Sequence, residues 1–104
     1  MKRWVIGSLA ATALLVSSQV KALDREGAFD ALVNAAIYTK LCDGAISANT
    51  QKILNGYAQL FRMDVEVEKK LLFAADFTKR YQDQKAALCF DAKQAVEELE
   101  SKYK

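Results

Sequence analysis

The stretch "KLCDGAIS", residues Lys40 to Ser47, contains one of only two cysteines in the 104-residue chain. Its sole potential partner is Cys89, almost fifty positions further along. The chain has no histidine, so the three or four ligands of a zinc or copper site and the imidazole base of a cysteine nucleophile are both missing. Redox-active pairs usually have the compact Cys-x-x-Cys spacing. We therefore predict a structural disulfide between Cys42 and Cys89.

The first 22 residues, "MKRWVIGSLAATALLVSSQVKA", have the pattern of a secretory signal. Two basic residues precede an apolar run that is too short to span a bilayer of ~30 Å as a helix. Small residues then precede the cleavage point expected between Ala22 and Leu23. An uncleaved anchor or a buried helix is the alternative. The sequence predicts a cleaved secretory signal peptide over residues 1–22 and a single helical domain over 23–104, located in a bacterial periplasm or secreted.

Removing this leader changes the net charge. The whole chain has a formal charge of +2, from 15 Lys and Arg against 13 Asp and Glu. Three of the basic residues lie in the leader, so the remainder has a formal charge of about −1. Charges of both signs alternate, and no basic run suits phosphates or anionic lipid. We expect no nucleic-acid partner and no membrane association after signal cleavage.

The rest of the chain has the composition of helices. It contains no proline and is rich in Ala, Leu, Lys, Glu and Gln. Apolar residues recur at helical spacing in four segments. The predicted helices cover Asp24–Leu41, a segment starting after Ser47 or Asn49, Val65–Tyr81, and Gln84–Lys102. The predicted fold is all-α, a small bundle of about four helices stapled by one disulfide. The sequence leaves open whether the last two helices are separate, with Asp83 as the best break point.

Local features refine this outline. Asp24 and Asp64 are the expected N-caps of the first and third helices. Gly44 is expected to end the first helix in the left-handed conformation. Gly56, inside the second helix, is expected to mark close packing against a neighbour.

The segment "LLFAADF", Leu71 to Phe77, departs from simple amphipathicity. Tyr81 shares the apolar face of this predicted helix, whereas Leu72 and Phe73 fall outside it and Phe77 lies at its margin. Either the helix is central and packs on two sides, or these three side chains form an exposed patch for a partner protein or a second subunit. Leu72, Phe73 and Phe77 are the candidate interaction patch.

Catalytic constellations are missing from the sequence. Without histidine no conventional nucleophile triad is possible, and no glycine-rich phosphate loop occurs. The clustered glutamates lie in charge-alternating helices, as solvated surface residues do. We expect no enzyme, no catalytic residue, no metal and no cofactor.

The leading hypothesis is a small exported binding protein that recognises another protein, for instance as an inhibitor, immunity factor or accessory subunit. In layout the chain also resembles the periplasmic acid-stress chaperones of the HdeA type: a signal peptide, a short helical domain and two cysteines almost fifty residues apart. That resemblance implies chaperone activity at low pH. Protonating 13 carboxylates below pH ~3 would loosen the fold and expose apolar surface. A third hypothesis is a carrier of a small hydrophobic ligand with a pocket between helices.

Overall fold

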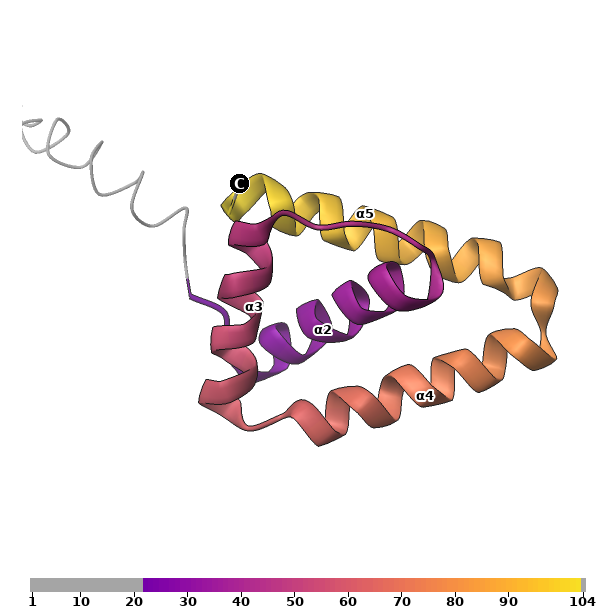
Figure 1. Cartoon of the computed structure of the whole chain (residues 1–104), viewed down its shortest axis with the longest axis horizontal. Coiled ribbons are helices and arrows are strands. Elements are labelled where there is room, and N and C mark those ends of the chain that lie inside the picture. Colours follow the sequence, from indigo (N-terminus) through magenta and orange to yellow (C-terminus); the bar gives the residue numbers. More distant parts are fainter. Residues whose placement is uncertain (1–21, 104) are drawn as a thin grey trace, which may run out of the picture.

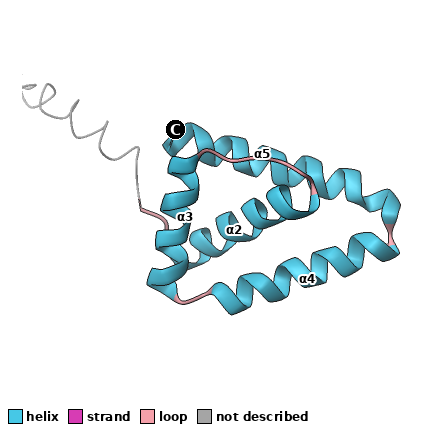
Figure 2. Cartoon of the chain, viewed as in Figure 1, coloured by secondary structure: helices cyan, strands magenta, loops and turns pink. Residues whose placement is uncertain are grey.

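A computed structural model describes residues 22–103 of the chain. Four α-helices make up this part: α2 (Arg25–Ala36), α3 (Ala48–Phe61), α4 (Asp64–Arg80) and α5 (Lys85–Tyr103). A short π-helix, η1 (Ile37–Leu41), continues α2, and a 3₁₀ turn, η2 (Gln82–Gln84), separates α4 from α5. No strand occurs among residues 22–103 (Figure 2). The predicted all-α bundle is confirmed, and its last two helices are separate. Apart from Ala22, the predicted signal peptide lies outside the described residues.

Helix α2 is the centre of the arrangement. It contacts α3, α4 and α5. In Figure 1, α5 runs along one side of α2 and α4 along the other, and these two helices converge at η2. Helix α3 closes the opposite, wider end of this wedge. Helix α4 is therefore at the edge of the molecule, and the alternative in which it is central and packs on two sides is wrong.

Side-chain caps set the starts of the first two helices. Asp24 Oδ1 accepts a hydrogen bond from the backbone N–H of Gly27 at 2.7 Å, as predicted. Ser47 Oγ accepts from the backbone N–H of Thr50 at 3.2 Å. The predicted cap of α4 is wrong by one position, because Met63 occupies the N-cap without a side-chain bond. Asp64 lies in the first turn instead, where its negative charge interacts favourably with the positive end of the helix dipole.

The break between α4 and α5 lies where the sequence placed it. Tyr81, with φ −121° and ψ 72°, leaves the helical region, and Asp83 lies within η2. Tyr81 was predicted to share the apolar inner face of α4, but it is 52% exposed. The helix ends at Arg80, so the helical periodicity no longer directs the Tyr81 side chain inward.

The loop after η1 uses its glycine differently from the prediction. Asp43, not Gly44, adopts the left-handed conformation, with φ 56°. Gly44 is required for close approach, since a Cβ there would overlap the ring of Tyr38. The expectation for Gly56 is also wrong, because a Cβ at that position would meet no atom within 4 Å.

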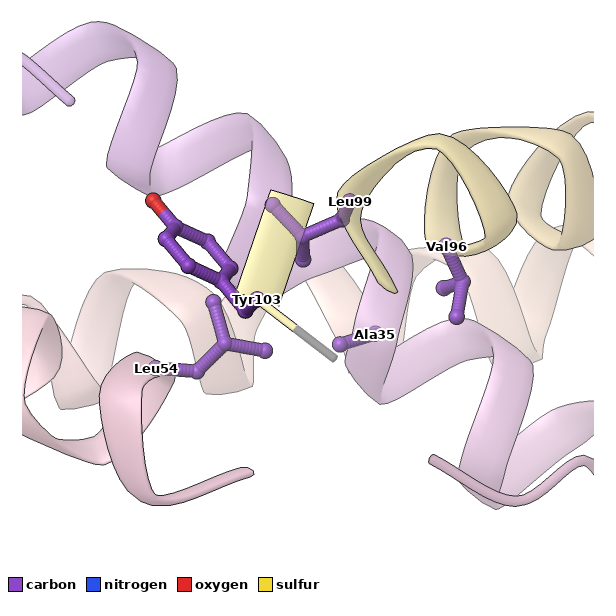
Figure 3. Packing of buried hydrophobic residues seen from close by; sticks show 5 residues of the cluster. All are labelled: Ala35, Leu54, Val96, Leu99 and Tyr103. Atoms are coloured by element: carbon purple, nitrogen blue, oxygen red, sulfur yellow. The ribbon is translucent and has the colours of Figure 1, made fainter. Parts of the chain in front are cut away.

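The core consists of two small clusters. The first lies between α2, α3 and α5 and contains Ala35, Leu54, Val96, Leu99 and Tyr103 (Figure 3). Burial, and secondarily the neighbouring hydroxyl of Tyr57, raises the pKa of Tyr103 above its ordinary value.

The second cluster lies where η1, α4 and α5 meet. Its buried members are Ile37, Leu71 and Ala92, and Cys42 packs against them. This cluster attaches α4 to the rest of the molecule.

Alanine substitutions of Gly44 in the loop and Gly56 in α3 are a matched test of the loop and helix geometry. We predict that Gly44→Ala lowers the free energy of unfolding by about 1–3 kcal/mol, because the new methyl group collides with Tyr38. Gly56→Ala should raise it by about 0.5–1 kcal/mol, because alanine is the better helix former and the site is open. Urea denaturation measures both. Equal effects of the two substitutions would contradict this account.

Candidate protein-binding surface

The predicted disulfide between Cys42 and Cys89 is present. It joins the end of η1 to α5 across a Cα–Cα distance of 5.7 Å and a sequence separation of 47. Closing a loop of this length contributes about 4 kcal/mol in the chain-entropy model. Among residues 22–103 no free cysteine remains, and no group of three or more His, Cys, Asp or Glu side chains is placed to hold a metal ion. The disulfide therefore acts as a structural clamp between the end of η1 and α5.

Helix α4 packs through one face only. Leu71 and Thr78 are its buried residues. Leu71 contacts the second core cluster, and the Thr78 hydroxyl donates to the carbonyl of Ala74 at 3.0 Å. Among residues 22–103, no helix covers the side chains on the opposite face of α4.

The structure leaves all three candidate patch residues exposed to solvent. Leu72 is 60% exposed, Phe73 is 71% exposed and Phe77 is 38% exposed. We call these three residues the α4 patch. Large apolar side chains gathered on one surface are typical of interaction sites, whereas single exposed ones are common.

Sequence reasoning missed one aromatic neighbour of the patch. The rings of Phe77 and Tyr81 lie 5.1 Å apart at a tilt of 43°. Phe73, Phe77 and Tyr81 are spaced at intervals of four residues, the signal by which this aromatic line could have been found. Tyr81 extends the apolar surface to the end of the helix.

A depression lies beside the α4 patch. Phe29 of α2 lines it together with Glu66, Lys69, Lys70 and Phe73 of α4. The four α4 residues have the spacing i, i+3, i+4 and i+7, so they surround a single gap on the helix surface.

Charged groups form the border of this surface. Glu66 pairs with Arg25 of α2 at 2.9 Å. Asp76 and Arg80, spaced i and i+4 on α4, pair at 3.1 Å. Both pairs are well exposed, and exposed pairs of this kind contribute little to stability, about 0–1 kcal/mol. Their side chains remain accessible to a binding partner.

A cavity of about 270 Å³ lies between α2, α3 and α4. Its lining mixes apolar residues such as Leu54 and Leu71 with charged ones such as Lys40, Asp64 and Glu68. Ligand pockets are usually about 300–1,000 Å³ and mostly apolar. The cavity is therefore a poorer candidate site than the α4 patch.

Comparison with protein-family models, with characterised proteins and with solved structures gave no significant match to this chain. Within residues 22–103, no helix has the length and apolar character needed to cross a membrane.

Neighbouring positions on α4 provide a direct test of this surface. We predict that Phe73→Ala changes the free energy of unfolding by less than about 0.5 kcal/mol, because the ring is exposed. Leu71→Ala should lower it by about 2–4 kcal/mol, because Leu71 is buried in the second cluster. Urea denaturation of both variants measures the difference. If Phe73→Ala destabilised the protein as much as Leu71→Ala, the patch would belong to the core.

Proposed function

We propose that this chain is a small exported helical protein that binds another protein through the α4 patch. The observation that carries the proposal is the exposure of Leu72, Phe73 and Phe77 on one helix whose opposite face is packed. Burying such side chains against a partner removes apolar area from water, at about 25 cal/mol per Å². The disulfide supports export, because such bonds persist in oxidising compartments.

The composition of the surface favours a protein as the partner. Aromatic side chains act as anchors in protein interfaces, and a charged border surrounds them. Here Phe73 and Phe77 are the anchors, while Lys69, Asp76 and Arg80 supply charges of both signs. A border of mixed sign gives a protein partner complementary positions without attracting polyanions.

The acid-chaperone hypothesis depends on the same exposed surface and on its growth at low pH. The surface is already exposed in the folded structure, and this favours a binding protein as the first proposal.

Site-specific photo-crosslinking in living cells tests the proposal. A photoreactive phenylalanine at position 73 should give a discrete crosslinked species with another protein. The same residue at position 90 should not, because Phe90 is also well exposed, at 59% against 71% for Phe73, but lies on α5. Once the partner is purified, Phe73→Ala should weaken its affinity by about tenfold or more, as truncation of an interface anchor does. Identical crosslinks at both positions, or unchanged affinity of Phe73→Ala, would overturn the proposal.

A further inference from the structure

We infer that the α4 patch is self-complementary, and that two copies of this chain pair through antiparallel α4 helices. The inference rests on the proposed function, because it uses the same surface, and it adds a defined occupant. In the pair, Phe77 of each copy fills the depression beside Phe73 of the other. The interface is isologous, as in most homodimers.

The shape of the depression is the first argument. Glu66, Lys69, Lys70 and Phe73 surround it with the spacing i, i+3, i+4 and i+7. Four residues so spaced form the hole that receives one side chain of a facing helix in knobs-into-holes packing. Phe29 of α2 gives this hole an additional apolar wall. An aromatic side chain from a second helix is the natural occupant.

In an antiparallel pair of α4 helices, the side chain that reaches each depression is Phe77 of the other copy. When a two-fold axis passes beside Phe73, residues equally far before and after it meet across the interface. Phe77 follows Phe73 by four positions, so it meets the partner's Lys69, which precedes Phe73 by four and lines the hole. Because of the two-fold symmetry, Phe77 of each copy fills the hole on the other copy.

Charge complementarity selects the antiparallel direction. The first turn of α4 carries Asp64 and Glu66, and the last turn carries Lys79 and Arg80. An antiparallel pair sets the acidic turn of each copy against the basic turn of the other, whereas a parallel pair would oppose like charges. In the register above, Arg80 lies seven positions after Phe73 and meets the partner's Glu66, seven positions before it.

The surroundings of α4 allow a second copy to approach. Figure 1 shows α4 along the outer edge of the wedge, with α2 on one side and no other element beyond it. The side chains of Glu66 and Arg80 are 52% and 70% exposed despite their intramolecular partners. Self-pairing would cover the α4 patch, so it competes with the binding of a different protein.

Sedimentation of the purified, oxidised protein over a range of concentrations tests the inference. Wild type should show a reversible monomer–dimer equilibrium. Glu66→Arg and Arg80→Glu should each weaken the dimer by about tenfold, because each places like charges together at two symmetric positions. An equimolar mixture of the two variants should dimerise as well as wild type, since the mixed pair has opposite charges at both contacts.

Apolar variants give the matched comparison. Phe77→Ala should weaken the dimer by about tenfold or more, because both holes are emptied. Phe90→Ala should leave it unchanged, because Phe90 lies on α5. Circular dichroism checks that each variant keeps its helices.

Three results would overturn the inference: a wild type that stays monomeric up to about 1 mM, the weakest affinity of interest; a mixture that dimerises no better than its components; or equal effects of Phe77→Ala and Phe90→Ala. A monomeric wild type that still crosslinks to another protein through position 73 would overturn self-pairing and leave the proposed function standing. A dimer with the predicted charge behaviour but without such a crosslink would overturn the proposed function and leave self-pairing standing.

Discussion

The bond between Cys42 and Cys89 is the constraint on which the rest of this structure depends. It ties the end of the central helical segment to α5, and the whole of α3 and α4 lies within the loop that it closes. The core consists of two small clusters, and a small domain has a net stability of only about 5–15 kcal/mol. A contribution of about 4 kcal/mol from the crosslink is a large part of that total.

The same constraint explains why one helix keeps a face free. The disulfide lies beside the cluster of Ile37, Leu71 and Ala92, so it supports the inner contact of α4. Around this contact α4 is held by the Arg25–Glu66 pair near its start and by the turn η2 at its end. With only four helices in the described domain, none remains to cover the outer face. The apolar side chains of the α4 patch therefore stay exposed.

Local signals in the sequence predicted the helices well. Hydrophobic periodicity and the caps Asp24 and Ser47 act over three or four residues, so they can be read without knowing the fold. The disulfide was predicted from the composition, because the chain has two cysteines and no histidine. The interaction patch was predicted only as an alternative, because periodicity placed Leu72 and Phe73 off the apolar face but could not show whether another element covers them.

The misses have tertiary causes. Gly44 is needed because the ring of Tyr38 lies against it, a contact that no local rule contains. Arg25 and Glu66 are 41 positions apart, so no helical spacing within α4 predicts their ion pair. Tyr81 became exposed because the helix ended one residue earlier than the pattern suggested. The contacts of Gly44 and Glu66 thus depend on tertiary structure, whereas the exposure of Tyr81 depends on where α4 itself ends.

The most direct test of the account is the free energy of unfolding of the double variant Cys42→Ser/Cys89→Ser, measured by urea denaturation against the oxidised wild type. If the bond is the clamp that holds the fold, the variant should be less stable by about 2–5 kcal/mol, as when a native disulfide is removed from a small domain. A double variant as stable as the wild type would contradict the account.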